Sequence, residues 1–517
     1  MNLDKLNENW DLVVIGGGIT GAGIFREAVR IGLKTLLVEK NDFSWGTSSR
    51  SSKLIHGGLR YLKDGRFLLT YDSVKQRQRL MTEAPGMVEP VHFMVPLYKG
   101  ASPGRWAMKT GLAIYDIMAG CNNHSYLNAD QFKQMIPQIN PNGLTGGFRF
   151  MDAQVDDSRL VLRLINESIA SGGLALNYTA ACEIIRDIHG AVESVRIEDS
   201  ETQETRTIST RAVINATGTW AEQLHPSPQK NLHIRPLRGS HLIFPGGLLP
   251  IDQAVTLTHP ADKRPLFIIP WEGALLLGTT DLDHGKDIST EAKMTKAEAL
   301  YMMAALTAYF PSAGIQLKDA VSSFAGIRPV LSKGNRPPSQ ESREFIVWIN
   351  KGLVTVTGGK LTTFRTLAKN ALTAAAPFLP GKPDVKIHEP AFAPPPRQPN
   401  QQNGLNPLTL RRLYGRYGNA TEAMISGADA KDIEPINGTH TLWAELPQLA
   451  KTEQIRHLSD LLLRRVRVGL LTQNGGREFL NRIQALCENS LPWDKTRWET
   501  EKQQYIDHWE SFYSIPG

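Results

Sequence analysis

One segment near the N-terminus, DLVVIGGGITGAGIFREAVRIGLKTLLVEK over residues 11–40, constrains the fold more than any other part of the chain. Its apolar run Leu12–Ile15 has the composition of a strand buried in a parallel sheet. A helical pattern follows over Ile19–Ile31, with Gly32 placed as its C-terminal stop. A second strand is expected over Thr35–Val38. The order of strand, glycines, helix and strand predicts a β-α-β unit of an α/β fold.

The glycines between the first strand and the helix have the G-x-G-x-x-G spacing of a dinucleotide pocket. Gly16 would make the tight turn, Gly18 would let the backbone approach a pyrophosphate, and Gly21 would let helix and strand pack closely. The helix N-terminus offers N–H groups and partial positive charge to phosphates. Glu39 follows at about the offset of a ribose-binding carboxylate. The alternative is a glycine-rich turn without a ligand, and the pattern does not separate NAD from FAD.

Two later segments repeat the strand-then-glycine pattern. RAVINATGTW, residues 211–220, is an apolar strand that runs into Ala-Thr-Gly, and GLVTVTGGKLTTFR, residues 352–365, is a third such unit. A chain that returns twice to one nucleotide resembles flavoproteins of the glutathione-reductase and D-amino-acid-oxidase type. This resemblance favours FAD as the cofactor. It implies a discontinuous Rossmann-like FAD-binding domain with a mixed-sheet substrate domain.

Further motifs narrow the resemblance. TSSRSSKLIHGGLRYLKDGRF, residues 47–67, is followed by MDAQVDDSRLVL, RGSHLIF, FIIPW, GTTD, FAGIRPVL and GGKLTTFR. In this order, over about residues 11–376, the chain resembles the FAD-dependent glycerol-3-phosphate dehydrogenase family. The resemblance implies oxidation of sn-glycerol 3-phosphate to dihydroxyacetone phosphate by hydride transfer to FAD. It also implies that the electrons pass on to a membrane quinone.

The segment TSSRSSK, residues 47–53, supplies hydroxyls and small side chains where a backbone could pass close to phosphates and a flavin. Composition alone favours a flexible polar loop. The resemblance instead implies that Ser48 and Ser49 lie beside the FAD pyrophosphate. The cofactor-binding residues that we predict over all segments are Gly16, Gly18, Ile19, Thr20, Gly21, Glu39, Lys40, Thr47, Ser48, Ser49, Ser52, Lys53, Leu54, Ala216, Thr217, Gly218, Gly359, Lys360, Leu361 and Thr362.

Three cationic side chains from distant parts of the sequence, Arg60, Arg328 and Lys360, suit a dianionic phosphate. Hydrogen bonds between such charged groups are the strong ones. Arg328 lies among apolar residues in FAGIRPVL, and a buried charge needs a partner, either a protein carboxylate or a ligand oxygen. The resemblance implies that Arg328 polarises the reacting oxygen. The predicted phosphate-binding residues are Arg60, Tyr61, Lys360 and Thr362.

A base must take the proton of the substrate hydroxyl, and its pKa should lie near working pH, which suits histidine. The candidates are His241, in RGSHLIF, and His56, in SSKLIHGG. We favour His241 because it lies on an expected strand of the substrate domain that could face the isoalloxazine. A histidine in the position of His56 is more often structural, and only the resemblance brings His56 into the active site.

A chain of 517 residues is too long for one ordinary core, so two or three domains are expected. We predict an FAD-binding domain over 1–95, 145–230 and 320–385, and a substrate-binding domain over 96–144 and 231–319. Substrate-domain strands are expected over Ile234–Phe244, Leu266–Trp271 and Ala274–Thr280. Prolines make 388–404 a stiff linker. Helical spacing in TLRRLYGRYG and QIRHLSDLLLRRVRVGLL then predicts a helical domain over 405–517.

The composition excludes several classes of protein. A balance of 58 Lys+Arg against 51 Asp+Glu fits an anionic ligand or membrane surface but is too weak to indicate nucleic acid. The three cysteines, Cys121, Cys182 and Cys487, are far apart in the sequence. We therefore expect neither a disulfide scaffold nor a metal site, and we expect the protein to lie in a reducing compartment. The N-terminus MNLDKLNENW lacks the apolar core of a secretory signal. No apolar run reaches the roughly 18 residues that cross a bilayer.

We therefore expect a cytoplasmic protein, attached peripherally to the cytoplasmic face of the membrane through its quinone-linked role. In GRWAMKTGLAIYDIMAG, residues 104–120, Arg105, Trp106 and Lys109 stand beside an apolar helical run that suits an interface. A core helix with a basic end is the equal alternative. A second basic group, Arg464, Arg465 and Arg467, could meet lipid headgroups, although a solvated helix face is at least as good an interpretation.

Three other functions fit parts of the sequence. The same scaffold serves a glycerol-3-phosphate oxidase, which is reoxidised by oxygen and releases hydrogen peroxide. An amine-oxidising flavoprotein of the glycine-oxidase type shares the nucleotide pattern and the G-x-R-P arginine, but the additional Arg60 and Lys360 argue against it. A nucleotide-binding regulator without turnover is the third. A homodimer is among the assemblies that the sequence leaves open.

Overall fold

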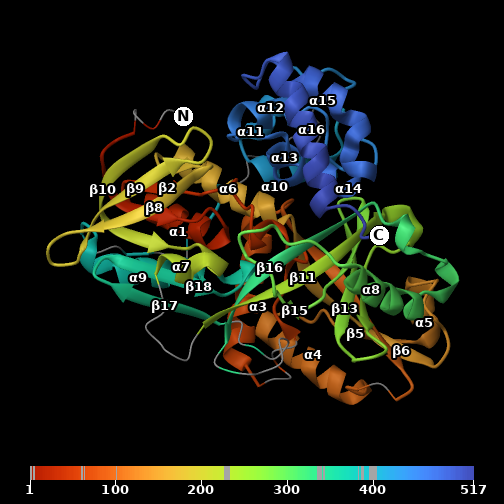
Figure 1. Cartoon of the computed structure of the whole chain (residues 1–517). Coiled ribbons are helices and arrows are strands. Elements are labelled where there is room, and N and C mark those ends of the chain that lie inside the picture. Colours follow the sequence, from red (N-terminus) through yellow and green to blue (C-terminus); the bar gives the residue numbers. More distant parts are fainter. Residues whose placement is uncertain are drawn as a thin grey trace.

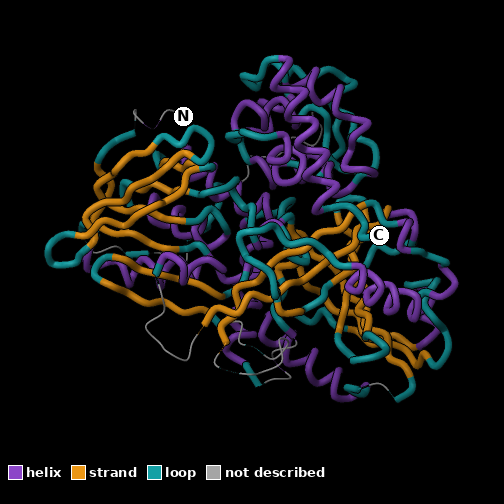
Figure 2. Tube along the Cα trace, in the orientation of Figure 1, coloured by secondary structure: helices purple, strands orange, loops and turns teal. Residues whose placement is uncertain are grey.

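The computed structural model describes residues 3, 6–59, 62, 65–100, 102–225, 233–332, 334, 341, 344–381, 384–385, 389–394 and 404–517. Two sheet-containing bodies lie side by side, and a group of helices from the C-terminal part of the chain packs against both (Figure 1). Figure 2 shows that strands dominate the two bodies and helices the third. The α/β fold with a helical C-terminal region is therefore confirmed.

The first sheet has eight strands, and its core is parallel because β1 pairs in parallel with both β2 and β10. The strand order is β17-β18-β10-β1-β2-β7, with β9 on β10 and β8 on β9. The strands are β1 (Asn9–Ile15), β2 (Thr35–Val38), β7 (Leu174–Leu176), β8 (Thr179–Arg186), β9 (Val192–Asp199), β10 (Thr205–Asn215), β17 (Phe345–Asn350) and β18 (Leu353–Gly358). The strand expected over Thr35–Val38 has these bounds.

Three helices cover the first sheet: α1 (Ile19–Arg30), α6 (Asp157–Ala170) and α9 (Phe364–Ala375). Helix α1 begins at the predicted residue and ends at Arg30, one residue before the predicted end. Apolar residues of the three helices and of the sheet form one buried core, which includes Val14, Phe25 and Leu164. Burial of this apolar surface, rather than helix propensity, holds the layers together.

The second sheet has ten strands in the order β15-β11-β14-β13-β12-β4-β6-β3, with β16 on β11 and β5 on β6. The strands are β3 (Leu54–Ile55), β4 (Val88–Tyr98), β5 (Ser125–Asn128), β6 (Leu144–Val155), β11 (His233–Pro245), β12 (Ala254–Thr258), β13 (Pro265–Trp271), β14 (Ala274–Gly278), β15 (Leu282–Asp283) and β16 (Ser322–Ser332). One buried cluster joins this sheet to α3 (Phe67–Glu83) and α4 (Arg105–Ala119), and another joins it to α5 (Ala129–Met135) and α8 (Lys296–Tyr309).

The sheets divide the chain differently from the predicted domain ranges. Strands β3, β4, β6 and β16 belong to the second sheet, although we expected most of their residues in the FAD-binding domain. The difference arises because β4 and β6 pair along their whole length and β16 pairs with β11, contacts that no local pattern reveals. The predicted boundaries therefore do not follow the sheets in these segments.

The C-terminal domain, residues 404–517, consists of short helices and one longer one. They are α10 (Pro407–Tyr417), α11 (Ala420–Ile425), α12 (Glu445–Thr452), α13 (Leu458–Asp460), α14 (Val468–Leu471), α15 (Leu480–Cys487) and α16 (Lys495–Phe512). A π-helical turn over Leu461–Arg465 follows α13. The predicted helical domain is confirmed in kind, but the segment with helical spacing around 455–471 is broken into turns rather than one helix. Most of the predicted linker, 388 and 395–403, lies outside the described residues.

Within the described part of the chain, no helix combines the length and the apolar character that crossing a bilayer requires.

Candidate cofactor and active site

The turn between β1 and α1 is built around glycines that leave no room for side chains. Gly16 has φ +113°, and a Cβ there would lie 2.6 Å from the Ala216 carbonyl oxygen. A Cβ on Gly21 would lie 1.8 Å from the Gly16 oxygen. The end of β1 therefore touches both its own helix and the end of β10. These close approaches match the roles that the sequence pattern assigns to the two glycines.

The N-terminus of α1 faces the segment over residues 47–53, which we call the cofactor loop. The Ile19 amide donates to Ser48 Oγ at 2.9 Å, and a Cβ on Gly18 would lie 3.1 Å from the same oxygen. The first turn of α1, where Thr20 is half-buried, carries no acidic residue. A helix N-terminus cradled by glycine and serine attracts an anion. These residues fit the pyrophosphate of a dinucleotide.

Glu39 lies at the end of β2, where a ribose-binding carboxylate is expected. Its Oε2 accepts from the Gly17 amide at 2.7 Å and its Oε1 accepts from the Asn41 amide at 2.9 Å. Burial raises the pKa of Glu39 above its ordinary value, against these two hydrogen bonds. Each carboxylate oxygen has a further lone pair that suits a ribose hydroxyl. Lys40, the next residue, is exposed.

The cofactor loop is ordered by contacts on both sides. The Thr47 hydroxyl donates to the Ile327 carbonyl of β16. Lys53 turns its ammonium inward, where it donates to the Ser49 carbonyl at 2.6 Å and to Asp157 at 2.8 and 3.0 Å. Burial lowers the pKa of Lys53 to about 8 despite the Asp157 carboxylate. The Lys53 side chain therefore supports the loop from within, and the buried Leu54 starts strand β3. A direct contact of either with the cofactor stays a prediction.

The two later glycine segments meet beside β1. The Ala216 amide donates to the Ile15 carbonyl at 2.8 Å, and the Thr217 hydroxyl donates to Asn215 at 2.7 Å. The Gly218 carbonyl accepts from the Thr357 hydroxyl at the end of β18 at 2.9 Å. Gly359 and Lys360 follow β18. A single helical turn over Leu361–Thr363 comes next and leads directly into α9. The twice-returning chain predicted from the sequence is therefore present.

His241 lies on β11 and is fully buried. Its Nε2 is 2.9 Å from Ser52 Oγ of the cofactor loop, and its ring stacks on Phe324 with centroids 4.7 Å apart. Its Nδ1 is buried without a hydrogen-bond partner in the described residues. Burial, together with the charges of Arg328 and Lys53, holds the pKa of His241 well below its ordinary value. The ring is therefore neutral at physiological pH, and its lowered pKa makes it a weaker base than an ordinary histidine.

Arg328 lies on β16, beside β11. Its guanidinium donates to Thr279 Oγ1 at 2.9 Å and to Asp281 Oδ1 at 3.3 Å, and 23% of the side chain is exposed. A Cβ on Gly239 would lie 2.4 Å from this guanidinium, so the glycine lets it cross the strand. Of the two partners that the sequence left open, Arg328 thus has the protein carboxylate, and part of its side chain stays exposed.

The remaining predicted residues are placed only in part. Lys360 is half-buried, and its ammonium donates to Ser73 Oγ of α3 at 3.1 Å. Thr362 is buried, and His56 is half-buried just after β3. Arg60 and Tyr61 lie outside the described residues. The structure brings His241, Arg328 and the cofactor loop together, whereas the meeting of all three predicted cations on one substrate stays a prediction.

Sequence reasoning missed the acidic residues behind the cofactor loop. Asp157 accepts from Ser51 and Lys53, and Asp42, just after β2, accepts from two arginines of the C-terminal domain. The motif MDAQVDDSRLVL contained the signal, because two adjacent acids at the start of a helix need partners when buried. No cluster of three or more metal-ligating side chains occurs in the described ranges.

Arg464, Arg465 and Arg467 do not match either interpretation given from sequence. All three are at most 2% exposed, so they are neither lipid-facing nor part of a solvated helix face. Their carboxylate partners are Asp42, Asp460, Asp156, Asp157 and Glu453. The expectation was wrong because most of these carboxylates are more than 300 residues away in the sequence.

Comparison with known proteins agrees with this geometry. A family model described as FAD dependent oxidoreductase matches residues 11–365, and one described as the C-terminal domain of alpha-glycerophosphate oxidase matches residues 379–498. The aerobic glycerol-3-phosphate dehydrogenase of Staphylococcus haemolyticus is 31% identical over 89% of this chain and 87% of that protein. The Bacillus subtilis protein of the same name is 35% identical over 72% of this chain and 67% of that protein.

Two solved structures share the fold. The FAD complex of the Bacillus halodurans glycerol-3-phosphate dehydrogenase is 26% identical, with a TM-score of 0.75 over 98% of this chain and 94% of that one. The Mycoplasma pneumoniae L-alpha-glycerophosphate oxidase is 18% identical, with a TM-score of 0.59 over 75% of this chain and 100% of that one. At this identity the match shows only that the two proteins share a fold.

Proposed function

The chain belongs to the FAD-dependent glycerol-3-phosphate dehydrogenase family, and from this premise we propose that it oxidises sn-glycerol 3-phosphate to dihydroxyacetone phosphate. One observation carries the proposal beyond family likeness. A neutral, buried His241 contacts the cofactor loop through Ser52 and lies close to the charge of Arg328. A proton acceptor, a cation and the loop expected at the flavin therefore meet at one place.

FAD supplies the hydride acceptor when it is bound. The turn at Gly16–Gly21, the N-terminus of α1 and Ser48 would hold its pyrophosphate, and Glu39 its ribose, because the glycines leave space there and the helix favours an anion. The chain itself contributes binding, orientation and exclusion of water.

His241 and Arg328 have different proposed roles at the substrate hydroxyl. We assign acceptance of the hydroxyl proton to His241 Nε2, which faces Ser52; FAD, when bound, would supply the acceptor for the hydride from C2. Arg328 would polarise the reacting oxygen from its exposed edge. The substrate phosphate would be held by Arg60, Tyr61, Lys360 and Thr362, in line with the strength of charge-assisted bonds to phosphate.

Rapid mixing of the FAD-loaded enzyme with sn-glycerol 3-phosphate under anaerobic conditions tests the assignment. His241→Ala should slow reduction of the flavin by about 10²–10⁴-fold while FAD stays bound, because a general base contributes about that much. His56→Ala is the matched comparison and should leave the rate within about tenfold of wild type. A His241→Ala variant that is reduced as fast as wild type would exclude His241 as the base.

We further propose that electrons leave to a quinone and that α3 and α4 form the attachment surface, on the cytoplasmic face of the membrane. The exposed fractions are 82% for Leu68, 73% for Trp106 and 78% for Ile117. Helices α3 and α4 pack together at the end of the molecule opposite the C-terminal domain (Figure 1). Large apolar side chains beside Arg105 and Lys109 suit the boundary of an anionic bilayer.

A second candidate acceptor is oxygen, and the match of residues 379–498 to a glycerophosphate-oxidase domain favours it. The two candidates differ in product. Turnover in air with peroxide detection, run beside turnover with a soluble quinone analogue, separates them. The quinone proposal requires much faster reoxidation by the quinone than by oxygen, and peroxide formed in step with dihydroxyacetone phosphate would replace it with the oxidase.

A further inference from the structure

The C-terminal domain touches the cofactor loop and its surroundings at three separate places. First, Asp157, the first residue of α6, joins the loop to the domain. Its carboxylate accepts from the Ser51 amide at 2.9 Å, from the Ser51 hydroxyl at 2.7 Å and from Lys53 at 2.8 Å. The same carboxylate accepts from Arg467 Nη2 at 2.6 Å. One fully buried group thus holds the loop on one side and the C-terminal domain on the other.

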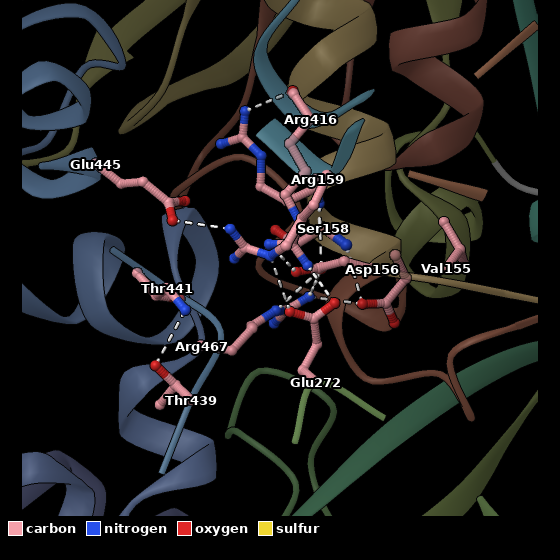
Figure 3. A network of polar contacts seen from close by, with 12 residues as sticks. Val155, Asp156, Ser158, Arg159, Glu272, Arg416, Thr439, Thr441, Glu445 and Arg467 are labelled. Atoms are coloured by element: carbon pink, nitrogen blue, oxygen red, sulfur yellow. Dashed lines mark hydrogen bonds and ion pairs between the residues drawn. The ribbon is translucent and has the colours of Figure 1, made fainter. Parts of the chain in front are cut away.

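Arg467 is anchored in turn by the neighbouring carboxylate. Its Nε and Nη2 donate to Asp156 Oδ1 at 3.0 and 2.7 Å, and Arg416 approaches Asp156 Oδ2 at 3.4 Å. Figure 3 shows Arg467, Arg416 and Asp156 converging, with Glu272 beside them. Because each of these charges is buried, each needs its partners in place, and the loss of one leaves a neighbour uncompensated.

The second contact fixes the segment that precedes the cofactor loop. Asp42 lies between β2 and the loop and is fully buried. Arg465 Nη2 donates to Asp42 Oδ1 at 2.7 Å, and Arg464 also donates to this carboxylate. Because Glu39 lies three residues earlier in the chain, the arginines brace the turn on the ribose side of the cofactor site.

The third contact reaches the strand that carries the partner of His241. The Ser323 amide donates to the Tyr513 carbonyl at 2.7 Å, directly beside Phe324, on which His241 stacks. Arg50 of the loop donates to the Tyr513 hydroxyl at 3.1 Å. The end of the chain therefore touches both the loop and β16.

We propose that the C-terminal domain sets the position of the cofactor loop and of His241, with Arg467 as the principal positioning residue. Arg467 acts through Asp157, Ser51 and Lys53 and reaches neither cofactor nor substrate itself. The effect on cofactor binding requires only that FAD binds at the loop, whereas the effect on His241 rests on the function proposed above.

The test uses the full-length protein, freed of FAD and titrated with it while flavin fluorescence is followed. Arg467→Gln removes the link to Asp157 and should raise the dissociation constant of FAD at least tenfold. Arg163→Gln is the matched control, because the buried Arg163 of α6 donates to the Tyr414 and Gly415 carbonyls of the C-terminal domain, at 3.1 and 2.7 Å, and these contacts do not touch the loop. It should change the constant by less than about threefold. Equal changes in both variants, or none in Arg467→Gln, would overturn the proposal.

A gentler pair keeps the test decisive if Arg467→Gln does not fold. Tyr513→Phe removes the hydroxyl that Arg50 contacts, whereas Tyr505→Phe removes a buried hydroxyl that donates to the Gly475 carbonyl at 2.6 Å within the C-terminal domain. Tyr513→Phe should weaken FAD binding about threefold, with Tyr505→Phe at the wild-type value. Weakening by Tyr505→Phe alone, or by both equally, would show a general loss of stability instead of positioning.

A kinetic readout separates positioning from the proposed chemistry. In Arg467→Gln saturated with FAD, kcat for glycerol 3-phosphate should fall more than tenfold. KM should change by less than threefold, and Arg163→Gln should stay close to wild type in both constants. A fall in affinity for the substrate alone would contradict positioning of His241. The FAD titration stands whether or not glycerol 3-phosphate is the substrate, so a failure of the proposed function would not be mistaken for a failure of this proposal.

Discussion

Two short basic segments of this chain look alike as sequence and have opposite surroundings in the structure. Arg105 and Lys109 flank Trp106 at the start of α4, where all three are exposed. Arg464, Arg465 and Arg467 lie in and after the π-helical turn, where they are buried. Both segments were candidates for contact with lipid headgroups, and the structure leaves only the first on the surface.

The difference lies in the partners and not in the basic residues. The Arg105 guanidinium lies over the Tyr126 ring, 3.7 Å from its centroid, and the Lys109 ammonium lies 5.6 Å from the centroid of the Trp106 ring. Both basic side chains are exposed. The buried arginines meet carboxylates from α6 and from the segment after β2. A basic segment therefore predicts a membrane contact only when no distant acidic residue is folded onto it.

The largest expected effect separates the two segments by stability. Arg465→Met leaves Asp42 buried with Arg464 as its remaining arginine partner, so the apparent free energy of unfolding of the apoprotein should fall by about 3–5 kcal/mol. Lys109→Met should change it by less than about 0.5 kcal/mol, as exposed substitutions do. Urea unfolding followed by circular dichroism measures both. Similar losses in the two variants would remove the distinction on which the comparison depends.

An intermediate effect is expected in acid. Burial opposes ionisation of Asp42, but Arg465 and Arg464 outweigh it and hold the pKa at about 2. Because the folded pKa is depressed, the stabilisation is complete above the ordinary pKa near 4 and is lost as pH falls through about 2.

Between these limits the wild type should lose roughly 2 kcal/mol more stability than Asp42→Asn, which has no carboxylate to protonate there. Thermal unfolding of both proteins across this range gives the measurement. Parallel curves would mean that the arginine pair does not stabilise the ionised carboxylate.

The smallest effect concerns the exposed segment. Trp106→Ala combined with Lys109→Ala should reduce partitioning onto anionic vesicles about tenfold, since one basic residue near the surface contributes about 1 kcal/mol and an apolar side chain adds to it. Lys495→Ala, an exposed change on α16, is the control. Added salt should weaken binding of the wild type. Unchanged partitioning of the double variant would place the attachment surface elsewhere.

The sequence predicted those parts of the fold whose determinants are local. Strand β2 and the start of α1 agree with expectation because an apolar run, a glycine turn and a helix are written in consecutive residues. The contact of Ser48 with Ile19 follows from the predicted place of the cofactor loop at the helix N-terminus. The chain's two later returns to this sheet also appear as expected, with β10 beside β1 and β18 beside β10.

The remaining parts depend on pairings between distant residues. Nothing near Lys53 shows that its ammonium turns inward to Asp157, 104 residues away. The burial of Arg465 depends on Asp42, 423 residues away. Strand β16 joins the second sheet through β11, so its place could not be read from its own residues. Two of the predicted phosphate ligands, Arg60 and Tyr61, lie outside the described residues and stay predictions.

The most direct test of the proposed function is an anaerobic titration of the full-length, FAD-loaded protein with sn-glycerol 3-phosphate. The proposal requires the yellow flavin absorbance to bleach in proportion to the substrate added, with an equal amount of dihydroxyacetone phosphate formed. Glycerol, which lacks the phosphate, and glycine should leave the flavin oxidised at the same concentration. A flavin that stays yellow with glycerol 3-phosphate, or that glycine bleaches instead, would contradict it.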